Sequence, residues 1–219
     1  MRVVVAGGHG KIALRLERML AARGDVAVGL IRNPGHVREL RNAGAVPAIC
    51  DLEAARVDDV TAHLAAADAV VFAAGAGPGS GIPRKDTVDR AAAALLADAA
   101  ERAGVRRYLM ISSMGVDAPP SDGRDEVFAA YLRAKRAAEE DLRSRPLRWT
   151  ILRPGRLTDA PGRRRVRLAP RVERGDVPRD DVAHVLLALL DTATGGETLE
   201  LVGGETPIPD AVAQLRHHA

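Results

Sequence analysis

An α/β fold, in which helices cover both faces of a mostly parallel sheet, is the architecture that this 219-residue sequence predicts. Short runs of β-branched residues alternate with longer segments of helical periodicity along the whole chain. The connections between them are short, and parallel neighbours in a sheet need a helical crossover to join them. Because 47% of the residues are hydrophobic and only 2% are aromatic, we expect a core of Val, Leu, Ile and Ala.

The first strand and the first helix set the pattern for the rest of the chain. Val3-Val4-Val5-Ala6 is closed by two glycines, as is typical of a buried parallel strand. Ile12, Leu16 and Leu20 then fall on one helical face, and Gly24 supplies a stop. The expected strands are residues 3–6, 26–31, 45–50, 68–74, 106–113, 147–153 and 198–202. The expected helices are residues 12–20, 37–41, 88–99, 125–144 and 182–189.

A glycine-rich loop, Gly7-Gly8-His9-Gly10-Lys11-Ile12-Ala13, joins the first strand to the first helix. Its first glycine permits a tight turn, Gly10 lets the backbone approach phosphate groups, and Ala13 lets the helix pack close to the strand. The helix N-terminus then offers unpaired N–H groups and a positive dipole end to an anion. The loop therefore predicts a Rossmann-type, doubly wound domain that binds a dinucleotide.

The residue after the second strand indicates which dinucleotide. An NAD-binding protein usually places Asp or Glu about 20 residues beyond the glycines, where the acid binds the ribose hydroxyls. This chain has Arg32 there, and a guanidinium can pair with a 2′-phosphate. We expect NADP rather than NAD, with Lys11 adding positive charge nearby.

Tyr131 and Lys135 are four residues apart on an expected helix and so share one of its faces. A nearby ammonium helps a phenol to exchange a proton with a carbonyl or alcohol oxygen. Ser112-Ser113, at the end of the fifth strand, supplies the natural third partner. Only Lys11, Lys85 and Lys135 are lysines among 32 basic residues, which favours a special role for Lys135. The alternative is that Tyr131 simply packs.

Residues 154–178 show no clear periodicity and follow the sixth strand. In an open α/β sheet, ligands bind at the carboxyl ends of the strands. We expect residues 155–178 to form a small substrate-side loop region that acts as a flap, within a single domain spanning 1–219. A mobile solvated loop is the alternative, also for its Arg163–Arg165 cluster.

Composition limits the possible partners and the cellular setting. A formal charge of +3, from 32 basic and 29 acidic residues spread along the chain, gives little support for a nucleic-acid partner. Cys50 is the only cysteine, so no internal disulfide can form, and no apolar run approaches the roughly 20 residues of a membrane span. We expect a soluble, cytoplasmic monomer or homodimer that takes a small-molecule substrate. The histidines show no metal-ligand spacing, so no metal site is expected.

Taken together, these signals resemble the atypical short-chain dehydrogenase/reductase superfamily, in particular its NAD(P)-binding and NAD-dependent epimerase/dehydratase group. NmrA-like regulators and biliverdin reductase B-type flavin reductases are similar. The resemblance covers nearly the whole chain. Besides the loop, Arg32 and the Tyr–Lys pair, it rests on Asp51-Leu52, Ala73-Ala74-Gly75, Asp89, Ser112-Ser113, Arg153 to Leu157 and Arg179 to Ala183.

The resemblance implies roles for residues outside these motifs. Asp51 and Leu52 would lie against the adenine, Ala73, Ala74 and Gly75 against the adenosine ribose and diphosphate, and Pro154, Gly155 and Leu157 beside the nicotinamide. Ser113 matches the substrate-orienting serine, while Asp89 stands where the family usually has an active-site asparagine. The short segment between Gly155 and Asp176 disfavours nucleotide-sugar epimerisation, because extended epimerases have a much larger substrate lobe.

The sequence thus predicts an NADP-dependent oxidoreductase that reduces a small carbonyl or a similar acceptor. Tyr131, Lys135, Ser113 and Asp89 are its expected catalytic residues. One alternative is a non-catalytic sensor of the NADPH/NADP ratio, as NmrA-like proteins are. Another is a flavin or quinone reductase, in which a bound acceptor takes hydride with little need for Tyr131.

Overall fold

The computed structural model describes residues 1–77, 79–117, 126–193 and 195–215. Within these residues, the main sheet has the order β11-β8-β10-β6-β5-β4-β1-β2-β3, and β7 pairs with β9 separately. The strands are β1 (Arg2–Ala6), β2 (Val26–Ile31), β3 (Val46–Ile49), β4 (Ala69–Phe72), β5 (Arg107–Ile111), β6 (Arg148–Pro154), β7 (Arg156–Thr158), β8 (Arg165–Ala169), β9 (Asp176–Pro178), β10 (Glu197–Gly203) and β11 (Thr206–Pro207). The predicted fold class, a Rossmann-like, mostly parallel α/β sheet, is confirmed.

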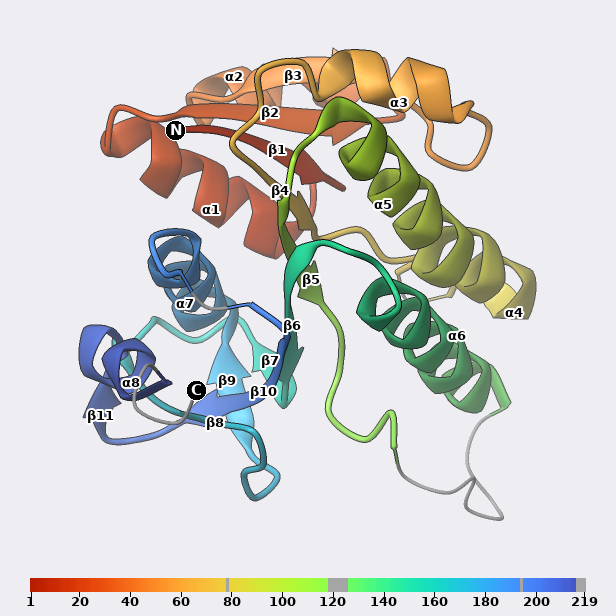
Figure 1. The fold of residues 1–219 in the computed structure, drawn as a ribbon. Coiled ribbons are helices and arrows are strands. Elements are labelled where there is room, and N and C mark those ends of the chain that lie inside the picture. Colours follow the sequence, from red (N-terminus) through yellow and green to blue (C-terminus); the bar gives the residue numbers. More distant parts are fainter. Residues whose placement is uncertain (78, 118–125, 194, 216–219) are drawn as a thin grey trace.

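Helices cover the sheet on both faces (Figure 1). They are α1 (Lys11–Ala22), α2 (Val37–Asn42), α3 (Val57–His63), α4 (Gly81–Arg84), α5 (Ala92–Ala103), α6 (Glu126–Arg143), α7 (Arg179–Leu190) and α8 (Ile208–Gln214). A 3₁₀ turn, η1 (Pro34–His36), precedes α2, and a π-helix, η2 (Lys85–Ala91), leads directly into α5.

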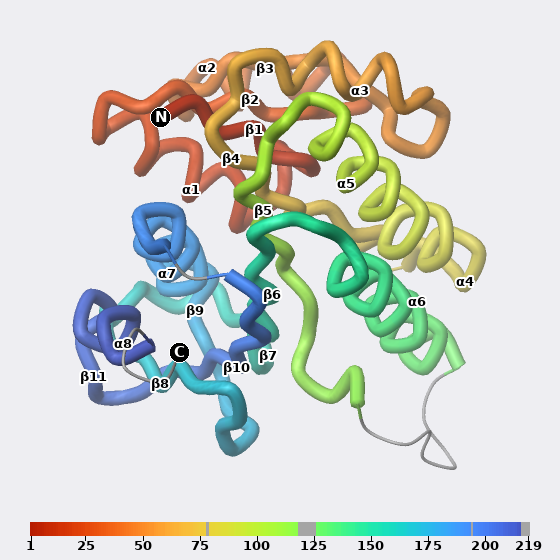
Figure 2. Tube along the Cα trace, in the orientation of Figure 1, coloured from red at the N-terminus to blue at the C-terminus, as the bar shows by residue number. Residues whose placement is uncertain are grey.

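The alternation of side chains along β1 builds a core on each face of the sheet. Val3 and Val5 pack with α1, α7 and α8 on one face, whereas Val4 packs with α3, α5 and α6 on the other. Figure 2 shows α5 and α6 side by side, with α1 and α7 on the opposite side of the central strands. Both cores are largely aliphatic, as the composition predicts, although Phe72 and Tyr108 are among the largest fully buried side chains.

The order of the central strands fixes where ligands can reach the sheet. β1 pairs in parallel with both β2 and β4, so the chain leaves β1 in one direction along the sheet and returns on its other side. Such a reversal opens a crevice at the carboxyl ends of the strands. The loops after β1, β2, β4, β5 and β6 all meet at this edge, because β1 to β6 are parallel.

The interpretation of residues 154–178 as irregular was wrong, because the segment contains β7, β8 and β9. In β8, Val166 and Leu168 are buried while Arg165 and Arg167 are exposed, which is the two-residue period of a half-buried strand. The density of arginines obscured that period. Four further elements, α3, α4, β11 and α8, were not predicted from the sequence, and all of them are short.

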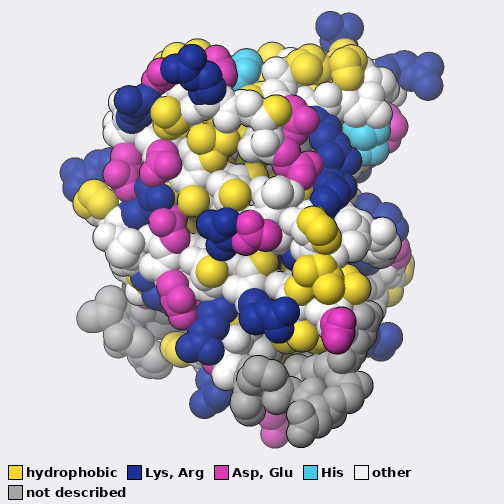
Figure 3. Space-filling view, turned by 90° about the vertical axis from the view of Figure 1, so that its right-hand side faces the viewer, with side chains coloured by type: hydrophobic (Ala, Val, Ile, Leu, Met, Phe, Trp, Pro, Cys, Tyr) yellow, Lys and Arg dark blue, Asp and Glu magenta, His cyan; other side chains and the backbone are white. Residues whose placement is uncertain are grey.

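The surface over α5 and α6 mixes acidic and basic side chains (Figure 3). Ion pairs account for part of the mixture, with Arg90 bound to Asp86 and Arg145 bound to Asp98 and Asp141. In the described part of the chain, no helix combines the length and the apolar character needed to cross a membrane.

A buried ion-pair network holds α6 against β6. Glu139 is fully buried and accepts hydrogen bonds from Arg153 at 2.9 and 2.6 Å and from Arg143 at 2.6 Å. Arg153 is also buried and contacts Asp117. Since buried charges need partners to offset their lost hydration, this network depends on each of its members.

We therefore expect Glu139→Ala to lower the free energy of unfolding by about 3–5 kcal/mol, because it leaves Arg153 short of a partner in the interior. The adjacent Glu140 is a matched control, since it forms only an exposed pair with Arg136. Glu140→Ala should cost about 0.5 kcal/mol or less. Urea unfolding of both variants measures the difference, and equal losses would contradict the role given to the network.

Candidate functional site

The glycine loop forms a tight turn that has no room for a side chain at Gly7. Gly7 has φ of 78°, and a Cβ on it would lie 2.6 Å from the Cα of Ala74. A Cβ on Gly10 would lie 3.1 Å from the carbonyl oxygen of Gly7. No side chain caps the N-terminus of α1, and its first turn contains no acid. The first turn of α1 thus has backbone N–H groups that no side chain caps, which suits an anion such as a diphosphate.

Cavity 1, of about 300 Å³, lies over this turn at the carboxyl ends of β1 to β4. Of the residues predicted to bind the cofactor, it brings together Gly7, His9, Gly10, Arg32, Asp51, Leu52, Ala73, Ala74 and Gly75. His9 stacks on His36 with ring centroids 3.5 Å apart, and His36 also lines the cavity. Residues distant in sequence therefore form one concave surface, because all of them follow parallel strands or begin the helices after them.

Glu53 and Arg84 also line cavity 1, and neither was predicted from the sequence to belong to the site. Glu53 contacts Arg84 at 2.7 Å, Arg32 at 2.9 Å and the hydroxyl of Thr87 at 2.6 Å. Hydrogen bonds from Arg84 and Thr87, together with the charge of Arg32, hold the pKa of Glu53 below its ordinary value. One carboxylate thus orients two guanidinium groups at the wall of the cavity.

Cavity 2, of about 660 Å³, lies over the carboxyl ends of β5 and β6. Five residues that the sequence assigned to catalysis or to the nicotinamide line it: Ser113, Tyr131, Pro154, Gly155 and Leu157. Its other lining residues are Ser112, Met114, Phe128, Arg156, Arg174, Gly175, Asp176 and Arg179. Polar groups from five separate segments therefore converge beside the cavity that holds the glycine turn.

The ring of Tyr131 lies near two buried lysines. The Nζ of Lys85 is 5.6 Å and that of Lys135 is 6.0 Å from the ring centroid. Lys85 comes from η2, and π-helical turns are frequent at functional sites. The Lys135 ammonium donates to the carbonyl oxygen of Ile111 at 3.1 Å and lies 3.3 Å from Asp89. Lys135 thus faces the protein interior, behind Tyr131.

Some predicted site residues lie behind the cavity walls instead of lining them. Five of the predicted site residues, all within the described part of the chain, line neither cavity: Gly8, Lys11, Ile12, Asp89 and Lys135. Lys11 pairs with Asp159 at 2.7 Å, and Ile12 is buried in the core. Asp89 is fully buried and accepts the Ala76 N–H at 3.3 Å, which connects the wall of cavity 1 to Lys135. The roles assigned to these residues stay predictions.

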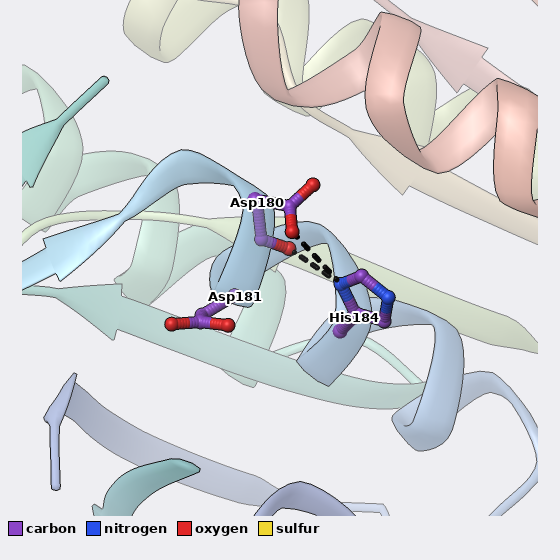
Figure 4. A group of neighbouring side chains, drawn as sticks. All are labelled: Asp180, Asp181 and His184. Carbon is purple, nitrogen blue, oxygen red and sulfur yellow. Dashed lines mark hydrogen bonds and ion pairs between the residues drawn. The ribbon is translucent and has the colours of Figure 1, made fainter. Parts of the chain in front are cut away.

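Asp180, Asp181 and His184 form a cluster at the start of α7 that has the composition of a metal site (Figure 4). The carboxylate of Asp181, however, accepts the backbone N–H groups of Arg163 and Arg164 at 3.0 and 2.8 Å. His184 is bound to Asp180 through the carbonyl oxygen at 2.9 Å. Asp181 therefore holds the residues just before β8 against α7, and His184 is held by Asp180 within its own helix.

Comparison with known proteins identifies the family. Residues 7–193 match the family model described as NAD(P)H-binding. The chain belongs to this NAD(P)H-binding family. The match includes the glycine turn and both cavities, so the expected relationship is confirmed at this level.

Individual relatives span nearly the full chain. The uncharacterized sugar epimerase YhfK of Bacillus subtilis is 33% identical over 98% of this chain and 100% of its own. A structure from Bacillus halodurans, described as a candidate NAD-dependent epimerase/dehydratase, is 36% identical with a TM-score of 0.90, covering 98% of this chain and 99% of that one. ChuY, an anaerobillin reductase of Escherichia coli O157:H7, is 24% identical with a TM-score of 0.79 over 93% and 97% of the two chains, and it shares the fold.

A buried carboxyl group lies directly beneath the glycine turn. Glu17 is fully buried, and neither of its side-chain oxygens has a hydrogen-bond partner among the residues that the structure describes. Its Oε1 lies only 2.9 Å from the position of a Cβ on Gly8 and 2.6 Å from that of a Cβ on Gly29. Burial raises the pKa of Glu17 from 4.5 to about 8. At neutral pH the group is protonated and does not repel an anion bound at the turn.

This burial makes stability depend on pH. Between its ordinary pKa and about 8, folded Glu17 keeps a proton that the unfolded chain releases, so stability falls as pH rises. We expect Glu17→Gln to remove that loss. Its stability relative to the parent should therefore increase by about 1.4 kcal/mol per pH unit between about pH 5.5 and 7.5. Urea unfolding across this range tests the prediction, with the exposed Glu173→Gln as control, and a difference independent of pH would contradict it.

Proposed function

We propose that this protein is an NADPH-dependent reductase of a small carbonyl or similar acceptor. The observation that supports it is the arrangement of two cavities at one edge of the sheet. Cavity 1 contains the glycine turn that precedes α1, and cavity 2 is lined by Tyr131, Ser112 and Ser113. A dinucleotide placed along β1 to β6 would bring its reactive ring to the second cavity.

The residues of cavity 1 fit a nicotinamide dinucleotide with a 2′-phosphate. The uncapped N-terminus of α1 suits the diphosphate. Gly7 has no side chain and packs closely against Ala74, so no Cβ covers the backbone of the turn. Arg32 and Arg84 converge on one carboxylate, so a phosphate could take over hydrogen bonds that Glu53 now accepts. This supports NADP over NAD.

In the proposed reaction, the bound reduced cofactor supplies a hydride equivalent to the acceptor carbon. Tyr131 donates a proton to the acceptor oxygen, so that the carbonyl becomes an alcohol and the phenol is left to regain a proton from solvent. Lys85 and Lys135 stabilise the negative charge that develops on the phenol oxygen, because both ammonium groups lie near its ring. Asp89 fixes Lys135 in place.

A sensor that binds NADPH without turnover is the second candidate. The burial of Lys135 against Asp89 favours it, because a lysine turned away from both cavities is less suited to contact a substrate directly. The name of the Bacillus subtilis relative suggests sugar epimerisation instead. Net consumption of NADPH separates these cases, since neither a sensor nor an epimerase consumes it.

The cofactor choice leads to a first test of the proposal. We expect NADPH to bind roughly tenfold to a hundredfold more tightly than NADH, because a charge-assisted phosphate contact is worth about 1.5–3 kcal/mol. Arg32→Ala should lose most of this preference, whereas Glu53→Gln should increase it by removing a competing anion. Titration calorimetry with both nucleotides measures these effects.

Arg38 supplies the control for this test, because it is exposed on α2 and does not line cavity 1. Arg38→Ala should leave both affinities unchanged. Equal binding of NADPH and NADH by the parent protein would contradict the choice of NADP.

The role of Tyr131 leads to a second test. Tyr131→Phe keeps the ring but removes the transferable proton, so carbonyl reduction should fall about 10²- to 10⁴-fold. NADPH affinity should change little, because Tyr131 does not line cavity 1. Steady-state oxidation of NADPH with a panel of carbonyl compounds gives the rates.

The chain's other tyrosine makes a matched control. Tyr108 is fully buried and donates to the carbonyl oxygen of Ala93, outside both cavities. Tyr108→Phe should reduce stability by about 1 kcal/mol and leave the rate unchanged. Full activity of Tyr131→Phe would indicate a flavin-type reductase, and no turnover by the parent would indicate a sensor.

A further inference from the structure

Cavity 2 has more positive than negative charge on its wall. Its charged lining residues are Arg156, Arg174, Arg179 and Asp176. Arg156 is neutralised by Asp176. Arg179 pairs with Asp159 at 3.0 Å, but Asp159 is shared with Lys11. The described residues provide no acidic partner for Arg174, so its charge is available to a ligand.

Arg174 lines the cavity and reaches the segment that follows β5. It belongs to the connection between β8 and β9, on the far side from β5. Its guanidinium nevertheless lies 3.2 Å from the position that a Cβ on Gly115 would occupy, just beyond β5. The left-handed conformation of Gly115, with φ of 91°, and its lack of a side chain leave this space free. A guanidinium in such a position presents a planar set of donors that matches a carboxylate.

A second polar group in cavity 2 also lacks a partner. Ser112 is 4% exposed and lines the cavity, and its Oγ makes no hydrogen bond within the described part of the chain. The neighbouring Ser113 differs, because its hydroxyl donates to the carbonyl oxygen of Met114 at 3.2 Å. An unpaired buried hydroxyl costs free energy unless a ligand or water satisfies it. Of the two serines, Ser112 is therefore the one whose hydroxyl still needs a hydrogen-bond partner.

The remaining wall is apolar. Met114, Phe128, Pro154 and Leu157 line it, and Phe128 is among the few large hydrophobic side chains that remain exposed. A volume of about 660 Å³ accommodates a body well beyond a single carbonyl group. The cavity thus combines a free cation, an unpaired hydroxyl and an apolar surface.

We propose that cavity 2 binds an amphipathic carboxylic acid, with its carboxylate on Arg174, a substrate oxygen on Ser112 and its apolar body against Phe128 and Met114. As a substrate assignment this rests on the proposed reductase function, because the acceptor carbonyl would belong to such an acid. The binding itself needs no turnover. Arg174 is here a specificity-determining residue.

The experiment measures binding and turnover separately. Phenylbutyrate, which has no carbonyl group to reduce, and its uncharged amide are titrated by calorimetry into the protein saturated with NADP. Benzoylpropionate and its methyl ester are then compared as substrates by NADPH oxidation. We expect the acid of each pair to be preferred roughly tenfold to a hundredfold, as for a charge-assisted hydrogen bond to a carboxylate.

Arg174→Gln should abolish the preference for the acid in both assays and leave the methyl ester unaffected, while Arg174→Lys should retain part of it. Arg171→Gln is the matched control, because Arg171 is exposed on the same connection and does not line the cavity. Ser112→Ala should weaken the binding of benzoylpropionate more than that of phenylbutyrate, because only benzoylpropionate has a ketone oxygen for Ser112 to bind.

The outcomes separate the two proposals. If phenylbutyrate binding depends on Arg174 but no carbonyl is reduced, the binding assignment stands and the reductase function fails. If the ester is reduced at the same rate as the acid, and if Arg174→Gln has the same affinities and rates as the parent, the reductase function stands and this inference is overturned. Equal losses in Arg174→Gln and Arg171→Gln would also overturn it, because they would indicate a general effect of surface charge.

Discussion

The buried pair of Lys135 and Asp89 is the interaction on which the geometry of the site depends. Both side chains are almost inaccessible to solvent, and their charges lie 3.3 Å apart. Removing two charges from water is costly, so such a pair persists only when further hydrogen bonds hold it. Asp89 accepts from Ala76, in the wall of cavity 1, and Lys135 donates to Ile111, at the end of β5. One pair thereby fixes the loop after β4, the π-helix η2 and helix α6 relative to one another.

The central fold could be predicted from the sequence because each of its elements has a clear period. β2 was predicted with its observed bounds, and α1, α5, α6 and α7 were recognised from apolar faces three and four residues apart. The peripheral elements could not be recognised in this way. β7, β9 and β11 are three residues long or shorter, and a two-residue period needs several residues to be visible. Their positions depend on pairing with distant strands, which local patterns do not encode.

The candidate site was predictable to the extent that its residues follow strands or stand in a turn. Arg32 follows β2 and Ser113 follows β5, so the parallel sheet brings both to the same edge. Glu53 and Arg84 lie farther from the strand ends, and only the folding of the connections after β3 and β4 brings them to Arg32. Asp89 was expected at the reaction centre on the basis of resemblance, but it lies behind the cavity walls because its π-helical turn packs against α6. The direction in which the Asp89 side chain points is thus determined by the packing of η2 against α6.

The use of lysine in this chain follows the same logic. Arginine supplies nearly all of its positive charge, yet the two buried cations beside Tyr131 are lysines. Lys85 donates to the carbonyl oxygen of Gly77 and Lys135 to that of Ile111, so each ammonium uses a single main-chain acceptor from a loop or strand end. A guanidinium has five N–H donors in a rigid plane and would need more acceptors than these narrow positions offer. Compact ammonium groups therefore place positive charge next to the phenol and leave the fewest N–H donors unsatisfied. The exposed walls of both cavities carry arginines instead, because a planar guanidinium suits contacts to phosphate or carboxylate.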